Sequence, residues 1–230
     1  MPKKLILFSA LALVAISCTD NESGSLTLLK NRKTTYSIII PENASTEEIR
    51  AADFLKEHLL LISGCTFPVV DANEPNPENC IFISKSDEVT TGDGFSMTTQ
   101  GSNLVIKGGQ NKGCIYGVSE LLGTYFGVRY FSPQYVVIPE VGDIVLPAIN
   151  INDSSPNTYR NVHGSFTNDP NYKDFNRLHT ISDMFAEGYY VHTFHRLVPW
   201  QQYFRSNPEY FAFMNGKRII DQLCLTNEDV

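Results

Sequence analysis

The sequence lacks the features of several large protein classes. Its 230 residues contain 18 lysines and arginines against 25 aspartates and glutamates, a formal net charge of −7, and no extended basic run. A nucleic-acid binder needs a basic surface to neutralise phosphates, so we exclude nucleic acid as a partner. Beyond the extreme N-terminus, no stretch of about 18 apolar residues could form a membrane-spanning helix.

Motifs for cofactors and metals are also missing. No GxSxG, P-loop or Rossmann fingerprint occurs, and the glycine-rich GGQNKG (108–113) lacks the Lys-Ser/Thr ending of a phosphate-binding loop. The five cysteines show no CxxC spacing, which argues against a structural zinc site. We therefore predict no cofactor and no metal. The four cysteines after Cys18 allow three disulfide pairings, although buried free thiols are the favoured interpretation.

The N-terminus has the pattern of an export signal. Lys3 and Lys4 precede an apolar run from Leu5 to Ile16, which predicts a signal peptide over 1–17. The segment Ala15–Cys18 resembles a bacterial lipobox, in which the cysteine is acylated, so Cys18 is the predicted lipidation site. The alternative is an ordinary secretory signal with an incidental cysteine.

These features predict where the protein resides. Residues 18–25 form a polar tether, whose acidic character resembles the surface-export signal of Bacteroidetes lipoproteins. We expect a chain in the bacterial cell envelope, lipid-anchored to the outer membrane and either periplasmic or surface-exposed. The lipid anchor would be its one contact with the membrane.

Residues 26–150 are predicted to form an α/β domain. A capping box at Ser45 and a glycine at position 64 delimit a helix over 46–63, and a second helical pattern ends at Gly127. Short β-branched or alternating runs predict the strands, including 36–41, 67–70 and 81–84 and a hairpin around residues 101–103. The expected fold is a small sheet covered by two helices.

The polar segment 152–158 marks a domain boundary, and residues 151–230 have a different composition. Four of the five histidines and the one tryptophan follow it. We predict strands over 159–166 and 189–194, a helix over 175–188, a long aromatic loop, and a further strand over 222–227. This order is that of the first strands of a (β/α) barrel, which needs about 250 residues, so we expect an incomplete barrel and a truncated chain.

Four residues of this second part are predicted to contact a ligand: His192, His195, Trp200 and Asn227. They fall at expected strand ends or in the aromatic loop, where barrel enzymes bind substrate. An aromatic face with nearby hydrogen-bond donors suits a sugar ring. The alternatives are a metal held by His192 and His195, which no accompanying carboxylate pattern supports, or simple structural roles.

Segment 111–133 carries a family resemblance. Its Gly113, Tyr116-Gly117, Leu121-Leu122, Gly127 and Arg129-Tyr130 resemble the end of the N-terminal domain of glycoside hydrolase family 67, the α-glucuronidases. They also resemble the second domain of β-hexosaminidases. Tyr130 departs from the tryptophan that often follows the arginine. Segment 191–230 resembles the opening of a Bacteroidetes barrel domain of unknown function.

The resemblance implies an exported glycoside hydrolase that acts on polysaccharide side chains by inverting chemistry. Its acid and base carboxylates would lie beyond Val230, so no catalytic residue is assigned and this chain is expected to be inactive. The predicted partner is a polysaccharide or oligosaccharide. The alternative function is a non-catalytic glycan-binding surface lipoprotein, and a third is a purely structural interaction domain.

Overall fold

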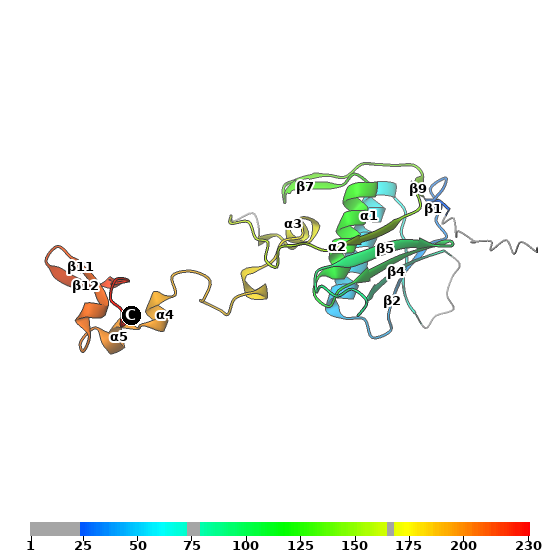
Figure 1. Cartoon of the computed structure of the whole chain (residues 1–230). Coiled ribbons are helices and arrows are strands. Elements are labelled where there is room, and N and C mark those ends of the chain that lie inside the picture. The colour runs from blue at the N-terminus through cyan, green and yellow to red at the C-terminus, as the bar shows by residue number, and fades with distance from the viewer. Residues whose placement is uncertain (1–23, 73–78, 165–167) are drawn as a thin grey trace, which may run out of the picture.

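The computed structural model describes residues 24–72, 79–164 and 168–230. The centre of the molecule is a six-stranded mixed sheet in the order β10-β5-β6-β4-β2-β3 (Figure 1). Its strands are β2 (Ser37–Ile40), β3 (Val69–Asp71), β4 (Cys80–Lys85), β5 (Phe95–Gln100), β6 (Asn103–Gly108) and β10 (Asn150–Asp153). Strands β3, β2, β4 and β6 run parallel, whereas β5 and β10 pair antiparallel.

Helix α1 (Thr46–Ser63) confirms the predicted helix and both of its caps. The Ser45 hydroxyl accepts from the backbone N–H of Glu48, the Glu48 carboxylate accepts from the N–H of Ser45, and Gly64 adopts the left-handed conformation that ends the helix. Its buried face is centred on Ala51, Leu55 and Leu59, and Ile49 is 45% exposed.

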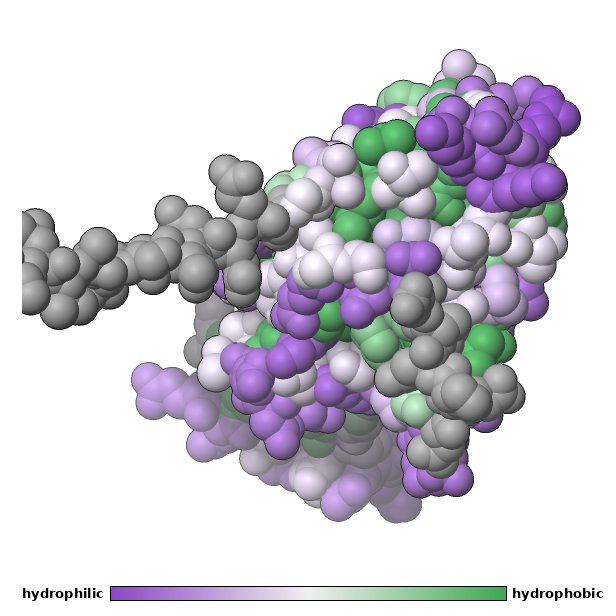
Figure 2. Space-filling view, turned by 90° about the vertical axis from the view of Figure 1, so that its right-hand side faces the viewer, coloured by the Kyte–Doolittle hydropathy of each residue, from purple (hydrophilic) through white to green (hydrophobic). Residues whose placement is uncertain are grey.

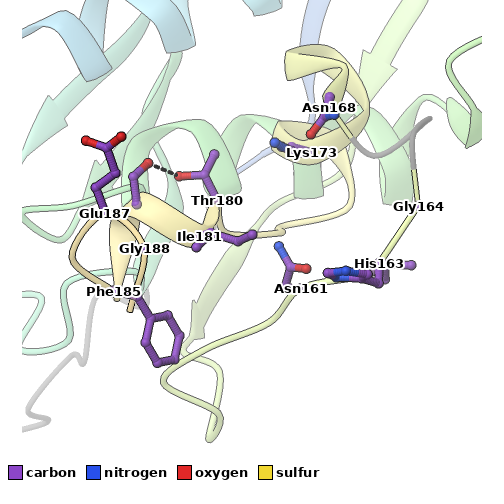
Figure 3. A pocket seen from close by; sticks show the side chains of 12 residues that line it. Asn161, His163, Gly164, Asn168, Lys173, Thr180, Ile181, Phe185, Glu187 and Gly188 are labelled. Atoms are coloured by element: carbon purple, nitrogen blue, oxygen red, sulfur yellow. Dashed lines mark hydrogen bonds between the residues drawn. The ribbon is translucent and has the colours of Figure 1, made fainter. Parts of the chain in front are cut away.

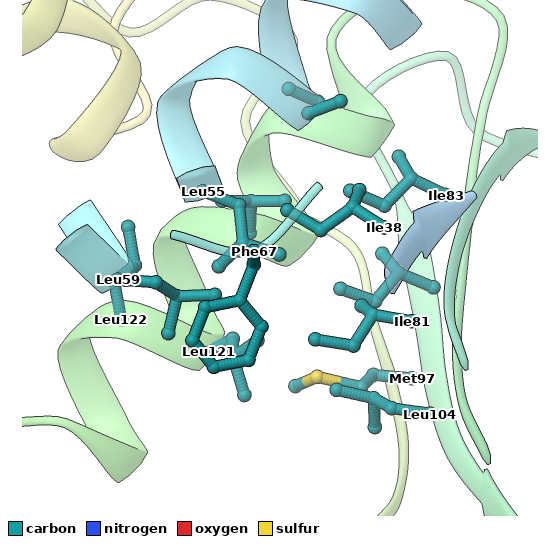
Figure 4. Close-up of a cluster of buried hydrophobic side chains, with 14 of the residues drawn as sticks. Ile38, Leu55, Leu59, Phe67, Ile81, Ile83, Met97, Leu104, Leu121 and Leu122 are labelled. Carbon is teal, nitrogen blue, oxygen red and sulfur yellow. The ribbon is translucent and has the colours of Figure 1, made fainter. Parts of the chain in front are cut away.

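Helix α2 (Gly113–Glu120) continues as the π-helical turn η1 (Leu121–Tyr125). Both helices pack on one face of the sheet, as predicted (Figure 1). Figure 4 shows the leucines of α1 and η1 facing the isoleucines of β2 and β4 across the core. Side chains alternate between the faces of a strand, so Ile81 and Ile83 enter this core while Phe82 between them is half-buried.

Two small sheets complete the α/β body. Strand β1 (Leu26–Leu29) pairs with β9 (Ile144–Leu146), and β7 (Arg129–Ser132) pairs with β8 (Tyr135–Val137). Figure 2 views the end of the molecule that carries β1 and β9, where the apolar areas are small and scattered among polar residues. Because β10 is an edge strand of the main sheet, that sheet extends to Asp153.

The predicted start of a (β/α) barrel is not confirmed. The described residues of 159–166 form no strand, nor do residues 189–193, because the positive φ of His192 (55°) interrupts the extended backbone there. The helix predicted over 175–188 is also wrong. Instead, the short α3 (Pro170–Phe175) ends where that helix was expected to begin, and the segment itself contains the 3₁₀ turn η3 (Ile181–Asp183).

The last forty residues form a small separate unit at the opposite end of the molecule from β1 (Figure 1). It contains α4 (Phe194–Leu197), α5 (Trp200–Tyr203), η4 (Pro208–Tyr210), β11 (Phe211–Met214) and β12 (Lys217–Leu223). The strand predicted over 222–227 is largely wrong: residues 222–223 end β12, the second strand of an antiparallel hairpin, and residues 224–227 form no strand. Asn215 and Gly216, both at positive φ, form the two-residue turn of this hairpin. The buried Phe211 packs edge-on against Phe204.

Candidate functional site

A cavity of about 770 Å³ opens in the segment that follows the main sheet. One wall is residues 161–164, the other is residues 180–188, and α3 contributes Lys173 (Figure 3). The walls combine an apolar side, with Ile181 and Phe185, and a set of polar groups. The volume falls in the range of small-molecule sites.

Local hydrogen bonds place the two walls beside each other. The backbone N–H of His179 donates to the carbonyl of Arg160 at 2.7 Å, and the N–H of Arg160 donates to Nδ1 of His179 at 3.0 Å. The Asn161 amide donates to the carbonyl of His179 at 2.8 Å. These three bonds join the beginnings of both walls.

The second wall is shaped by a capping box. The Thr180 and Asp183 side chains each accept from the other residue's backbone, so the chain makes the turn η3. The Thr180 hydroxyl lies 3.0 Å from that of Ser182 (Figure 3). The wall ends at Gly188, whose positive φ of 77° suits glycine.

An aromatic cluster of Tyr159, His163, Phe185 and Tyr190 supports the apolar side. The Phe185 ring makes T-shaped contacts with the rings of Tyr159 and Tyr190, at centroid distances of 5.5 and 5.1 Å. His163 stacks on Tyr190 at 6.0 Å. Phe185 remains 37% exposed, so its ring is available to a ligand.

The cavity contains groups of both charges. Lys173 and Glu187 belong to its lining. Asp183 is part of the second wall but not of the lining, and it forms an ion pair with Lys112 at 3.0 Å. Partial burial of Asp183 opposes ionisation, but hydrogen bonds from Thr180 and Lys112 outweigh it and hold the pKa of Asp183 below its ordinary value.

The donor set is suited to binding a polar ligand. Amide, hydroxyl, imidazole and ammonium groups can hydrogen-bond a polar ligand while Phe185 covers an apolar face. Glycoside hydrolysis uses two carboxyl groups. Among the described lining residues, Glu187 is the one carboxylate. Among all the residues that the structure describes, no group of three or more His, Cys, Asp or Glu residues is placed to hold a metal ion.

The predicted ligand-contacting residues lie elsewhere. His192 lies in irregular backbone before α4, and His195 is exposed on α4. Trp200 begins α5 with 39% exposure, and the Asn227 side-chain amide donates to the carbonyl of Glu209 at 3.2 Å. Within the described residues these four side chains make no hydrogen bond, ring contact or ion pair with one another, and none of them lines the cavity. Their role in sugar binding stays a prediction.

Sequence reasoning missed the residues that do line the cavity, above all Asn161, Thr180 and Phe185. One signal was present, because Thr180-Ile-Ser-Asp183 has the spacing of a capping box that starts a new turn. Nothing local to either wall indicates that residues 161–164 and 180–188 face each other.

The N-terminal predictions cannot be followed in the structure. Cys18 and the signal segment 1–17 lie outside the described residues, as does most of the tether. In the described part of the chain, no helix combines the length and apolar character needed to cross a bilayer. Cys65, Cys114 and Cys224 are free thiols, and Cys80 and Cys114 are buried.

Comparison with known proteins matches one family to the second half of the chain. The model of a domain of unknown function, DUF4838, matches residues 130–230. That range includes β7, the cavity and the C-terminal hairpin. A comparison with curated proteins gives no match.

Solved structures that are similar to this chain include glycoside hydrolases. A GH20 β-N-acetylhexosaminidase from Streptomyces coelicolor A3(2) shares 16% identity at a TM-score of 0.44, over 60% of this chain and 25% of that one. A GH20 exo-β-N-acetylglucosaminidase from Vibrio harveyi shares 14% at a TM-score of 0.41, over 60% and 18%. A GH138 enzyme targeting pectin rhamnogalacturonan II shares 16% at 0.38, over 54% and 12%. The chain thus spans a quarter or less of the length of these enzymes.

Proposed function

We propose that this chain is the N-terminal part of an exported carbohydrate-active lipoprotein, and that its cavity binds a sugar. The observation that carries the proposal is the composition of the cavity walls. The exposed ring of Phe185 lies in the same cavity as the polar side chains of Asn161, Thr180 and Lys173. A sugar ring has apolar C–H faces and a rim of hydroxyls, so it can use both kinds of contact at once.

The finer proposal is an α-glucuronidase-like glycoside hydrolase that acts on polysaccharide side chains. It is supported by the resemblance of segment 111–133 to glycoside hydrolase family 67. Hydrolysis needs a second carboxyl group besides Glu187, which another part of the full-length protein would have to supply.

A second candidate is a surface lipoprotein that binds glycans without cleaving them. The single carboxylate in the described cavity lining favours it. The two candidates share the cavity and differ in turnover. Incubating glucuronoxylan with the full-length protein and measuring released glucuronic acid separates them. Release supports the hydrolase. Binding without release supports the non-catalytic candidate.

The binding step is tested by calorimetric titration of the purified chain with oligosaccharides from glucuronoxylan and other plant or host glycans. We expect Phe185→Ala to weaken binding at least tenfold, because it removes the apolar platform. Phe213→Ala is the matched control, since Phe213 is a 62% exposed phenylalanine on β11 outside the cavity. Equal affinities of the two variants would contradict the proposed site.

The lipid anchor is tested separately. The full-length protein, expressed in a Gram-negative host with labelled palmitate, should incorporate the label and partition into detergent. Cys18→Ser should abolish both. Secretion of an unlabelled wild-type protein would support the alternative of an ordinary signal peptide.

A further inference from the structure

Asp93 of the α/β body contacts the beginnings of both cavity walls. It lies in the loop between β4 and β5, and its Oδ2 accepts from Nη2 of Arg160 at 2.9 Å and from Nε2 of His179 at 2.7 Å. Arg160 precedes the first wall and His179 precedes the second. A single carboxylate oxygen therefore joins the body of the protein to both sides of the cavity.

The hydrogen bonds define how His179 is held. Its Nδ1 accepts from the backbone N–H of Arg160, so Nδ1 carries no proton, and Nε2–H is the donor to Asp93. The ring also stacks on Tyr159 at 5.7 Å. With both nitrogens and one face engaged, the imidazole has one orientation, and that orientation joins the two walls.

The cluster of Asp93, Arg160 and His179 is largely buried. The side chains of Asp93, Arg160 and His179 are 16, 17 and 6% exposed. The Arg160 guanidinium also lies over the ring of Tyr116, 5.4 Å from its centroid. Removing one partner of a buried ionic cluster leaves the remaining charge uncompensated, which is costly. The contact is therefore built to persist rather than to exchange with solvent.

The glycine-rich segment 108–113 explains how Asp93 reaches this place. The N–H of Gly109 donates to the carbonyl of Gly94 at 2.8 Å, and the N–H of Asn111 to that of Gly92. A Cβ on Gly109 would stand 1.9 Å from the carbonyl oxygen of Thr91. The glycines thus allow two backbones to touch and hold the loop of Asp93 against the start of α2.

We propose that Asp93 is a positioning residue of the cavity. Through Arg160 and His179 it sets the distance and angle between the two walls, so the α/β body controls the affinity of the cavity for its ligand. The statement about affinity rests on the proposed sugar binding, whereas the statement about the walls does not. Asp93 itself does not line this cavity.

Hydrogen exchange of the purified chain tests the positioning without any ligand. We expect Asp93→Ala to speed amide exchange at least tenfold in residues 159–164 and 179–188, with the exchange of the main sheet unchanged. Asp87→Ala is the matched control, because Asp87 is an exposed aspartate of the same loop that accepts only from Gln110 in the described structure. Unchanged exchange in the walls of Asp93→Ala would overturn the proposal.

Asp93→Asn keeps the proposal testable if the alanine variant unfolds, since asparagine has the size of aspartate and retains an acceptor oxygen. Long-range ¹H–¹⁵N spectra of the wild type should show His179 as the neutral Nε2–H tautomer. In Asp93→Asn the resonances should shift and wall exchange should rise severalfold. A His179 spectrum identical to the wild type would contradict the positioning role, because a purely structural loop effect would leave this ring unchanged.

Titration with the glucuronoxylan oligosaccharides completes the test. If the wild type binds, affinity should fall at least tenfold in Asp93→Ala and remain unchanged in Asp87→Ala. Equal affinity in all three would overturn control of the cavity by Asp93. If no protein binds while wall exchange still responds to Asp93, the proposed function fails and the positioning of the walls stands.

Discussion

Nε2 of His58 lies 2.8 Å from the hydroxyl oxygen of Tyr130, and this contact ties helix α1 to strand β7. Nδ1 of His58 lies 2.7 Å from the carbonyl oxygen of Phe54, which can only accept, so Nδ1 carries the proton and Nε2 accepts from Tyr130. Burial raises the pKa of Tyr130 to about 12, which keeps its hydroxyl a donor. Tyr130 also packs on Phe175 of α3 at 4.9 Å.

Removing the donor should therefore destabilise the fold. We expect Tyr130→Phe to lower the free energy of unfolding by about 1–2 kcal/mol, because it leaves Nε2 of a buried histidine without a partner. Urea denaturation measures this change. Tyr135→Phe, at a tyrosine that is 63% exposed, should have an effect within about 0.5 kcal/mol.

His58 should also make stability depend on pH. Burial lowers the pKa of His58, so below the ordinary value near 6.5 the unfolded chain binds a proton that the folded chain does not. Stability should then fall as the pH drops from about 7.5 towards 5.5. In urea titrations across this range, His58→Gln should have a shallower slope than the wild type. The same slope in both would contradict this assignment, and His163→Gln, at an exposed histidine, is the control.

The glycine contacts at the start of α2 predict a severe backbone effect. A Cβ on Gly113 would stand 2.2 Å from the carbonyl oxygen of Gly94 and 2.8 Å from the Cα of Gly108. Both are backbone atoms, which cannot move aside as a flexible side chain could. We expect Gly113→Ala to cost several kcal/mol, seen as a large fall in melting temperature. Gly142→Ala should be nearly neutral, because a Cβ there has no heavy atom within 4 Å in the described structure.

The four described thiols should differ in reactivity. Burial raises the pKa of Cys114 to about 12, whereas a hydrogen bond from Thr226 lowers the pKa of the more accessible Cys224. Thiolates are the reactive form, so iodoacetamide at pH 7.5 should modify Cys224 first and leave Cys114 unmodified in the folded chain. Mass spectrometry of peptides reports the order. Early modification of Cys114 would show that the core around α2 opens readily.

The α/β body shows which structural features local sequence patterns predict. The capping box at Ser45 and the glycine at position 64 located both ends of α1, because caps depend on residues within one turn. The apolar spacing of α1 does not distinguish the exposed Ile49 from the buried Leu55 and Leu59. Apolar spacing predicts a face, but the neighbouring strands decide which residues at its edge are covered.

The segment after Asp153 shows where such patterns mislead. Aromatic and β-branched residues over 189–194 suggested a strand, yet His192 takes a left-handed conformation and α4 begins two residues later. The Asn215-Gly216 pair, which is typical of a two-residue hairpin turn, joins β11 to β12 where a long loop was predicted. Turn chemistry outweighed composition in both places.

Helices, turns and individual strands of the α/β body could be predicted from neighbouring residues, since hydrogen bonds within a helix or hairpin join residues close in the chain. The order of the strands in the sheet could not, because parallel strands pair across long stretches of sequence. The cavity could not. Asp93 and His179 contact each other although they are 86 positions apart in the sequence, and Asp93 and Arg160 are 67 positions apart. No periodicity or motif connects them. Their meeting depends on the packing of a glycine-lined loop against α2, and long-range contacts of this kind are settled only when the whole core assembles.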